Sequence, residues 1–271
     1  MKVKRVPFKK PQKRFSQNFL TDPGIARKIV DQLGISPADT VFEIGGGRGI
    51  LTSILAESGA RLFSFEIDRS LAGELKEKFK DRDNVEIVNV DFLKVEPEQY
   101  QAGEFKLIGN IPYDITSPLF HWILKYRGLI SRVVITTQRE LAQRISSGPG
   151  GKNWAPISIF TQCHFKVRAV MTIPSGAFYP KPKVHSSTLL LNPSAGYEIE
   201  NWDNFEKIVR ASFMHRRKLL VNNLSEAVAL SKEELEAILV RVGLDKIVRA
   251  EQLSIEDFIR LAREFKSLDL S

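Results

Sequence analysis

The stretch Thr40-Val-Phe-Glu-Ile-Gly-Gly-Gly-Arg-Gly49 decides the fold class of this chain. Its first five residues form a short apolar run typical of a buried strand. The glycines that follow permit a tight turn and a close approach of the backbone to a ligand. A helical pattern begins directly afterwards, at Ile50. A strand, a glycine-rich turn and a helix in this order predict a ligand-binding unit with the ligand at the start of the helix.

Strand and helix patterns alternate on both sides of this unit. Thr21 or Asp22, together with Pro23, predicts a helix start, with the helix running to about Leu33. Further strands are predicted over residues 61–67, 85–90, 105–109 and 132–137, and helices over 50–58, 69–80, 117–126 and 139–146. This alternation predicts an α/β fold with a parallel sheet covered on both faces. Residues 165–173 and 184–191 are expected to add a last strand pair, and residues 147–151 to form a mobile loop.

Charge divides the chain into a basic start and a nearly balanced body. The 271 residues carry a net charge of +8. Residues 1–14 hold seven Lys or Arg residues and no acid, which leaves 33 basic and 32 acidic side chains elsewhere. Between His121 and His185 there are ten Lys or Arg residues and a single acid, Glu140. Two separate basic features favour a polyphosphate partner over a merely solvated surface.

Composition excludes several classes of protein. There is no run of about 18 apolar residues, so neither a membrane span nor a membrane partner is expected. The basic start lacks the apolar segment of a secretory signal. The lone Cys163 fits a reducing cytoplasm, where we expect the protein to be located. The four histidines are scattered along the chain, so no metal site is predicted.

Acidic residues stand at the ends of the first three predicted strands: Glu43, Glu66 and Asp91. A dinucleotide-binding fingerprint is excluded, because counting from Gly45 and Gly47 the position that needs a third glycine holds Ile50. An acid followed by glycines at alternate positions is instead typical of methyltransferase cofactor loops. We expect Glu66 to accept hydrogen bonds from ribose hydroxyls and Asp91 to accept one from the adenine amine. Open α/β sheets bind ligands at this edge of the sheet.

The fourth predicted strand ends in Gly109-Asn-Ile-Pro-Tyr-Asp114. An adenine exocyclic amine is a poor nucleophile because its lone pair is delocalised into the ring. Carbonyl groups that accept hydrogen bonds from both N–H groups favour a pyramidal, nucleophilic nitrogen. Asn110 and the backbone at Ile111 or Pro112 suit this task, and Tyr113 offers a ring on which a flipped-out base can stack. The sulfonium of S-adenosylmethionine would supply the leaving group, so no strong general base is needed.

Beyond Asn192-Pro193 the pattern becomes helical, with capping boxes at Ser231–Glu234 and Ser254–Asp257. We therefore expect a domain boundary at about residue 193, with an α/β domain over residues 21–193 and a small helical domain over 194–271.

Five motifs in this order resemble the small-subunit ribosomal RNA adenine dimethyltransferases of the KsgA type. They are Phe15-Ser-Gln-Asn-Phe-Leu20, Glu43-Ile-Gly-Gly-Gly-Arg-Gly49, Asn110-Ile-Pro-Tyr113, Phe178-Tyr-Pro-Lys-Pro-Lys-Val184, and Phe213-Met-His-Arg-Arg-Lys218 with Asn222-Asn-Leu224. The resemblance spans nearly the whole chain. It implies a basic arm with a cofactor-capping motif over residues 1–20, an S-adenosylmethionine-dependent, Rossmann-like methyltransferase domain over 21–193 and a helical RNA-docking domain over 194–271.

The resemblance also implies a substrate and residue roles. The implied reaction dimethylates N6 of two adjacent adenosines near the 3′ end of small-subunit (16S) ribosomal RNA during ribosome assembly. A monomer would act on the pre-30S particle. Cofactor contacts are implied for Asn18, Leu20, Gly45, Gly47, Glu66, Asp91 and Asn110. The implied base-holding and catalytic residues are Asn110, Pro112, Tyr113 and Phe178. Implied RNA contacts are Lys181, Lys183, Arg216, Arg217 and Lys218. For the last three, the alternative role is to anchor the two domains to each other.

The chain departs from the pattern of this family at Ser16, Gly46, Arg48, Asp114 and His185. Arg48 stands where an apolar residue is usual, and Asp114 puts a charge beside the amine site. Three alternatives remain open. They are a large-subunit ribosomal RNA methyltransferase of the antibiotic-resistance type, a DNA adenine methyltransferase, and a ribosome-assembly factor that binds RNA without catalysis.

Overall fold

The computed structural model of this chain describes residues 17–101 and 103–265. The basic arm of residues 1–14, with Phe15 and Ser16 of the first motif, lies outside the described residues. The chain divides into two compact units. The first contains the described residues up to Arg139 together with Ala169–Leu191, and the second contains Glu140–Arg168 and the described residues from Asn192 onward. A functional domain boundary near residue 193 stays a prediction.

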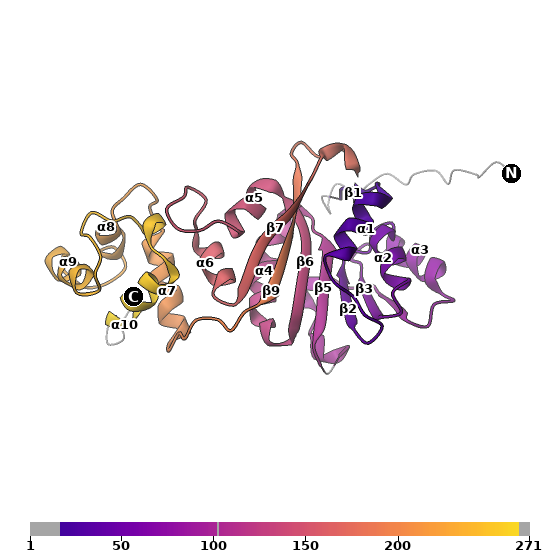
Figure 1. Cartoon of the computed structure of the whole chain (residues 1–271), viewed down its shortest axis with the longest axis horizontal. Helices are drawn as coiled ribbons and strands as arrows, with labels where there is room; N and C mark the ends of the chain where they lie inside the picture. The colour runs from indigo at the N-terminus through magenta and orange to yellow at the C-terminus, as the bar shows by residue number, and fades with distance from the viewer. Residues whose placement is uncertain (1–16, 102, 266–271) are drawn as a thin grey trace. The chain divides into compact units, whose positions relative to one another are not determined.

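A seven-stranded sheet forms the framework of the fold (Figure 1). Its strands are β2 (Thr40–Ile44), β3 (Arg61–Phe65), β4 (Val85–Val88), β5 (Phe105–Asn110), β6 (Ile130–Gln138), β7 (Phe165–Ile173) and β9 (Ser186–Pro193). Their order is β4-β3-β2-β5-β6-β9-β7. The strands from β2 to β6 pair in parallel, and β9 runs antiparallel to β6. The α/β class and the parallel sheet predicted from the sequence are confirmed.

Both faces of the parallel strands are covered. The helices of this unit are α1 (Pro23–Asp31), α2 (Ile50–Ala56), α3 (Arg69–Phe79) and α4 (Thr116–Lys125). Successive side chains of a strand point to opposite faces. Val41 and Leu62 accordingly share one buried cluster with residues of α1 and α2. On the other face Phe42 stacks on Phe105 with ring centroids 4.2 Å apart, and Trp122 of α4 lies 6.3 Å from Phe105.

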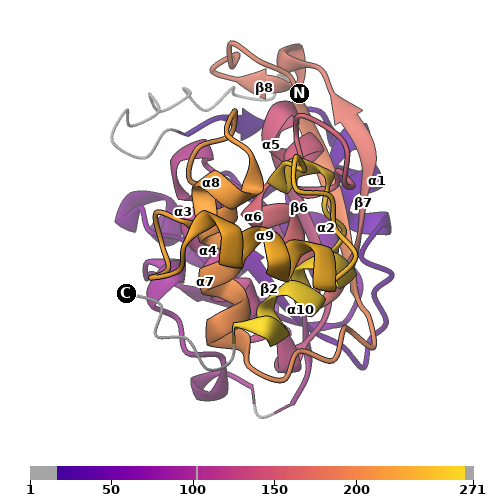
Figure 2. The ribbon, with the colours of Figure 1, turned by 90° about the vertical axis from the view of Figure 1, so that its left-hand side faces the viewer.

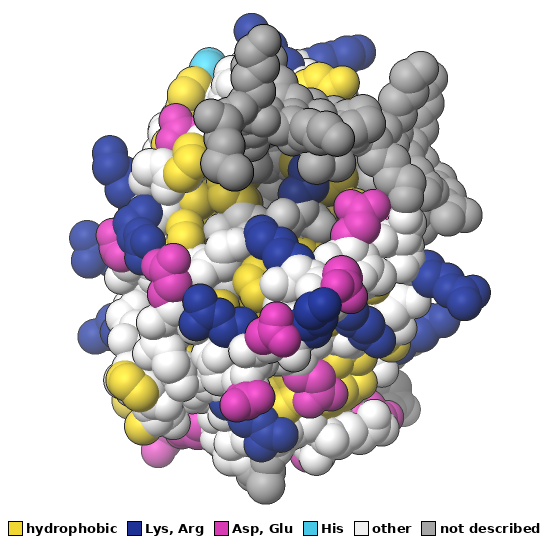
Figure 3. Space-filling model, turned by 90° about the vertical axis from the view of Figure 1, so that its right-hand side faces the viewer, with side chains coloured by type: hydrophobic (Ala, Val, Ile, Leu, Met, Phe, Trp, Pro, Cys, Tyr) yellow, Lys and Arg dark blue, Asp and Glu magenta, His cyan; other side chains and the backbone are white. Residues whose placement is uncertain are grey.

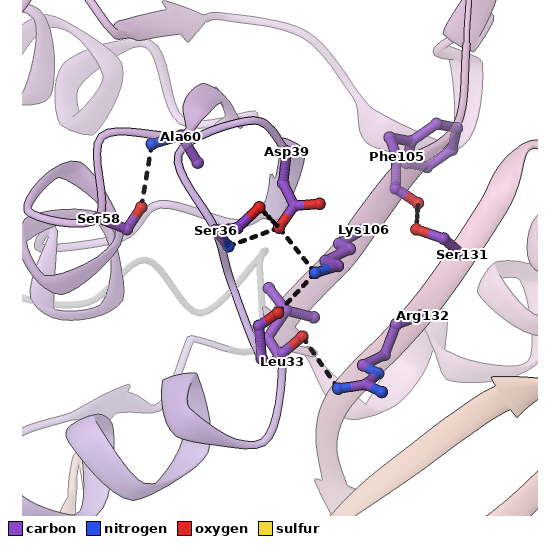
Figure 4. Close-up of polar contacts among 10 residues, drawn as sticks. Leu33, Ser36, Asp39, Ser58, Ala60, Phe105, Lys106, Ser131 and Arg132 are labelled. Carbon is purple, nitrogen blue, oxygen red and sulfur yellow. Dashed lines mark hydrogen bonds and ion pairs between the residues drawn. The ribbon is translucent and has the colours of Figure 1, made fainter.

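Polar contacts fasten the loop between α1 and β2 to the amino ends of β5 and β6 (Figure 4). The Lys106 ammonium lies 2.7 Å from the Asp39 carboxylate and also donates to the backbone oxygen of Gly34. Burial opposes ionisation of Asp39, but hydrogen bonds from Lys106 and Ser36 hold the pKa of this carboxyl below its usual value. Arg132 donates to the backbone oxygen of Leu33 at 3.3 Å. These contacts fix the position of the α1–β2 loop, and with it the start of β2, relative to β5 and β6.

A separate two-stranded sheet joins β1 (Phe19–Leu20) to β8 (Phe178–Tyr179). The pair is antiparallel, with Phe19 opposite Tyr179 and Leu20 opposite Phe178. The Thr21 N–H and hydroxyl both donate to the backbone oxygen of Ala177, which extends the pairing. The sequence pattern does not predict these strands, because two residues are too few to show a period. The pairing brings the first and fourth sequence motifs together.

The second unit is mostly helical (Figure 2). Its helices are α5 (Arg139–Ile145), α6 (Pro156–Gln162), α7 (Trp202–Ser212), α8 (Leu220–Leu224), α9 (Lys232–Arg241) and α10 (Ile255–Glu264). Both predicted capping boxes are present, at the starts of α9 and α10. In the part of the chain that the structure describes, no helix is both long and apolar enough to cross a membrane.

The glycine-rich stretch 147–151, expected to be mobile, is held by the C-terminal segment. The Gly150 N–H donates to the backbone oxygen of Glu251 at 2.7 Å. The indole N–H of Trp154 donates to the backbone oxygen of Leu253 at 2.9 Å. The mobility inferred from composition stays a prediction. The partners of Gly150 and Trp154 lie about 100 residues further along the chain, where a local sequence pattern does not show them. For the same reason residues 140–168 group with the C-terminal helices.

One face of the structure shows basic and acidic side chains interspersed, with hydrophobic side chains between them (Figure 3). This mixture agrees with the near balance of charge outside the first 14 residues. Such a surface does not create a single strong field across the whole face.

Glu43 connects the end of β2 to α2 and β3. Its side chain is fully buried, and one carboxylate oxygen accepts hydrogen bonds from the Thr52 hydroxyl of α2 at 2.7 Å and the Ser64 hydroxyl of β3 at 2.6 Å. The other carboxylate oxygen has no hydrogen-bond partner. Burial raises the pKa of Glu43 to about 7, against the opposing hydrogen bonds from Ser64 and Thr52.

We expect Glu43 to make the stability of the fold depend on pH. Between pH 4.5 and about 7 the folded state keeps a proton that the unfolded chain has lost. The contribution of this group to the free energy of unfolding therefore falls as pH rises through that window. Relative to Glu43→Gln, the wild-type free energy of unfolding should fall by up to about 3 kcal/mol from pH 4.5 to pH 8. Urea denaturation across this range measures the difference. For the control variant Glu77→Gln, at an exposed position, the difference from the wild type in the free energy of unfolding should be nearly constant with pH. A difference between Glu43→Gln and the wild type that does not change with pH would contradict the raised pKa of Glu43.

Candidate cofactor and base-binding site

A cavity of about 340 Å³ opens at the carboxyl ends of β2, β3 and β5. This volume lies within the range of roughly 300–1,000 Å³ usual for small-molecule sites. Nine of the residues implicated by the sequence line it: Asn18, Gly45, Gly47, Glu66, Asp91, Asn110, Pro112, Tyr113 and Phe178. They come from six separate stretches of the chain, all within the first unit.

The glycine turn after β2 forms one wall of the cavity. Gly45, Gly47 and Gly49 all have positive φ, at 72°, 55° and 74°. Side chains with a Cβ rarely adopt this conformation. A Cβ on Gly45 would meet no atom within 4 Å, so the backbone there faces open space in the cavity. A ligand can therefore approach the main chain of this turn closely.

Glu66 connects the end of β3 to the glycine turn. Its two carboxylate oxygens accept hydrogen bonds from the backbone N–H groups of Gly47 at 2.8 Å and Asp68 at 2.9 Å. Burial raises the pKa of Glu66, while the N–H groups of Asp68 and Gly47 act in the opposite direction. A carboxylate has about four lone-pair sites, so each oxygen can accept a further hydrogen bond from a ligand. This geometry fits a ribose acceptor.

The neighbouring wall suits a planar purine. Asp91 accepts the Leu93 N–H at 3.1 Å, which fixes its carboxylate at the cavity. The Phe92 ring lies 5.3 Å from Phe65 and is buried, and Ile67 is 47% exposed at the same cavity. Apolar side chains with one carboxylate beside them match an adenine ring and its amine. Together with Glu66 and the open backbone at Gly45, these residues fit S-adenosylmethionine.

Asn110 stands at the other end of the cavity, where β5 ends. Its side-chain N–H donates to the backbone oxygen of Asn18 at 2.9 Å. This contact uses the donor side of the amide and leaves its carbonyl oxygen to accept from a ligand. The hydroxyl of Tyr113 lies 3.0 Å from the Ser186 hydroxyl, which anchors the ring. Phe178 is 5% exposed and lines the same cavity.

The strand-end acid Glu43 and the implied cofactor contact Leu20 do not line the cavity. Glu43 is buried beneath the glycine turn and does not line the cavity. Leu20 packs into the cluster under α1 and α2. Several lining residues were missed, among them Gln17 and Phe19, although these two belong to the first sequence motif. Their positions follow from the β1–β8 pairing, which a sequence pattern does not reveal.

The predicted RNA-binding residues lie outside the cavity. Lys181 and Lys183 are exposed just beyond β8. In the second unit Arg216 pairs with Glu251 at 3.3 Å and donates to the backbone oxygen of Lys152. Lys218 pairs with Glu226, and Arg217 is exposed. Arg216 thus acts as an anchor within the second unit in this structure.

Comparisons with known proteins agree with this geometry. The family model described as ribosomal RNA adenine dimethylase matches residues 8–267. The chain is 40% identical over 257 residues to "Ribosomal RNA small subunit methyltransferase A" of Syntrophotalea carbinolica, covering 94% of this chain and 96% of the relative. The protein of the same name from Streptococcus sanguinis is 40% identical over 268 residues, covering 94% of this chain and 92% of the relative.

Solved structures give the same result. A dimethyladenosine transferase from Plasmodium falciparum has a TM-score of 0.78 at 27% identity, covering 91% of this chain and 96% of that chain. The 23S rRNA methyltransferase ErmE has a TM-score of 0.73 at 29% identity, covering 91% and 98%. The chain therefore belongs to the ribosomal RNA adenine dimethylase family, a family of S-adenosylmethionine-dependent methyltransferases.

Proposed function

We propose that this enzyme dimethylates N6 of two adjacent adenosines near the 3′ end of small-subunit (16S) ribosomal RNA during ribosome assembly. The observation that carries the proposal is the orientation of Asn110, whose amide N–H is held by Asn18 so that its carbonyl is left for an amine. The relatives named as small-subunit methyltransferases are 40% identical over nearly their whole length, which favours the small-subunit RNA over the large-subunit alternative. The enzyme acts as a cytoplasmic monomer on the pre-30S particle.

The mechanism follows from the residues at the β5 end of the cavity. When bound, S-adenosylmethionine supplies the methyl group on a sulfonium leaving group. The Asn110 carbonyl accepts one N–H of the target amine, and a backbone carbonyl at Ile111 or Pro112 accepts the other. Both hydrogen bonds favour a pyramidal nitrogen with an available lone pair. The rings of Tyr113 and Phe178 hold the flipped-out base against these acceptors.

The second methyl transfer places a different demand on the site. In each transfer the N6–CH3 bond would form as the S–CH3 bond of the sulfonium breaks, and the nitrogen would release one proton to water. After the first transfer the amine has therefore lost one N–H, so one of the two acceptors has lost its partner. Shape and stacking then hold the half-modified base more than paired hydrogen bonds do. The Tyr113 ring supplies that contact, and its hydroxyl, which lies 3.0 Å from the Ser186 hydroxyl, is not needed for stacking.

The reaction itself can be tested directly. Small subunits isolated without these methyl groups are incubated with the enzyme and S-adenosylmethionine, and the RNA is then mapped by mass spectrometry. We expect dimethyladenosine at two adjacent positions near the 3′ end of the 16S RNA. Methylation elsewhere, or of large-subunit RNA alone, would overturn the substrate assignment. Binding of the particle without any transfer would support the assembly-factor alternative.

Removal of the ribose acceptor should weaken cofactor binding. Loss of a charged hydrogen-bond partner costs roughly 1.5–3 kcal/mol. Glu66→Ala should therefore lower the affinity for S-adenosylmethionine about 10- to 150-fold in calorimetry. The exposed Glu77→Ala serves as control and should bind as the wild type does. Unchanged affinity in a folded Glu66→Ala variant would refute the role.

The Tyr113 ring should matter most for the second transfer. Loss of a stacked ring costs about 1–3 kcal/mol per base. Tyr113→Ala should therefore accumulate monomethyladenosine, with cofactor affinity nearly intact. Tyr113→Phe and Ser186→Ala are matched controls, since each loses the hydroxyl contact but keeps the ring, and both should complete two transfers. An unchanged ratio of mono- to dimethyladenosine in Tyr113→Ala would show that the ring does not hold the half-modified base.

The basic arm should add to RNA affinity in a salt-dependent way. Each phosphate contact contributes to the slope of log affinity against log salt. Deletion of residues 1–14, with seven Lys or Arg residues, should make this slope shallower. Filter binding to small-subunit RNA at salt concentrations from about 50 to about 300 mM measures the slope for each of the two proteins. Equal slopes for the truncated and full-length enzymes would mean that the arm makes no phosphate contact.

A further inference from the structure

Tyr179 is an exposed aromatic residue whose neighbours in β1 and β8 line the cofactor and base cavity. Its side chain is 48% exposed, whereas Phe178, the preceding residue of β8, is 5% exposed and lines the cavity. Successive residues of a strand point to opposite faces. Phe19, which is paired with Tyr179 across the two strands, also lines the cavity. The exposed ring is therefore flanked by two residues of the site.

The side chain of Arg48 supports this ring. Its guanidinium carbon lies 4.6 Å from the centroid of Phe19 and 5.7 Å from the centroid of Tyr179. Arg48 directly follows Gly47, which lines the cavity. A guanidinium within about 6 Å of an aromatic ring is attracted to it. The contact orders the Tyr179 ring beside the glycine turn and places a positive charge at the cavity edge.

The chain beyond Tyr179 is also largely exposed and basic. Lys181, Lys183 and His185 are exposed, and Val184 is 47% exposed. No acidic residue occurs between Glu140 and Glu198. Aromatic rings combined with basic side chains are what proteins use to bind single-stranded nucleic acid, since every base offers a face for stacking and every linkage a phosphate.

We propose that Tyr179 stacks on the nucleotide next to the target adenosine while Phe178 and Tyr113 hold the target base. This inference rests on the proposed function, in which the target is one of two adjacent adenosines. A base that flips out of its strand takes a stacking partner away from its neighbour. The exposed Tyr179 ring replaces that partner, and Lys181 and Lys183 neutralise the adjoining phosphates. A purine neighbour, with its larger face, is held better than a pyrimidine.

The test compares two substrates. One is the undermethylated small subunit with both adjacent adenosines, and the other is the same particle with one of the two replaced by uridine. We measure kcat/KM for methylation of the adenosine common to both, using the wild type, Tyr179→Ala and Tyr179→Phe. Val184→Ala is the matched control, because it also shortens a half-exposed apolar side chain in the same segment. Calorimetry measures the affinity of each variant for S-adenosylmethionine and so shows whether the glycine turn that lines the cofactor cavity is intact.

Tyr179→Ala should lower kcat/KM on the two-adenosine particle about 5- to 150-fold, mainly through KM, in line with the loss of one stacked base. On the uridine particle the loss should be clearly smaller. Tyr179→Phe and Val184→Ala should behave as the wild type, and cofactor affinity should not change. An equal loss on both particles, or an equal loss of cofactor affinity, would overturn the proposal and leave Tyr179 a structural role. An absence of transfer by the wild type would instead overturn the proposed function, and this inference with it.

Discussion

The turn between β2 and α2 is the constraint on which the rest of the site depends. It holds Gly45, Gly47 and Gly49 at positive φ, a conformation that residues with a Cβ rarely adopt. Because the turn is tight, the backbone of Gly45 faces the cavity and the N–H of Gly47 reaches the carboxylate of Glu66 at 2.8 Å. The Gly45 N–H also donates to the backbone oxygen of Phe65 at 2.8 Å, so two hydrogen bonds link the turn after β2 to the end of β3.

Glu43 supports this turn from below, and its chemistry explains why it is not a ligand. A carboxyl group with no solvent contact is costly to ionise unless it is fully hydrogen-bonded. Only one of its oxygens has partners, Thr52 and Ser64, so burial raises its pKa to about 7. The group serves to join β2, β3 and α2, whereas the acids Glu66 and Asp91 line the cavity.

The β1–β8 pairing performs the corresponding task at the amine end. It places Asn18 where its backbone oxygen accepts the Asn110 side chain, and Phe178 where its ring lines the same cavity. Both residues are positioned by a sheet with only two residues in each strand, which joins parts of the chain that are far apart in sequence. A site assembled in this way orients an amide and holds a base through neutral groups, although the Asp114 carboxylate also lines this end of the cavity.

The sequence by itself determined the parallel α/β core, the helix starts and caps, and most of the cavity residues. Strand ends and glycine turns have local signatures, and parallel strands bring their carboxyl ends to one edge of a sheet. Only the tertiary structure decided which acid faces the cavity, how the Asn110 amide is oriented, and where residues 147–151 are held. Glu43, Asn110 and Gly150 take their positions from Ser64, Asn18 and Glu251. Contacts between residues about 20 to 100 positions apart leave no periodic pattern in the sequence, because they depend on the packing of elements and not on the local conformation of the chain.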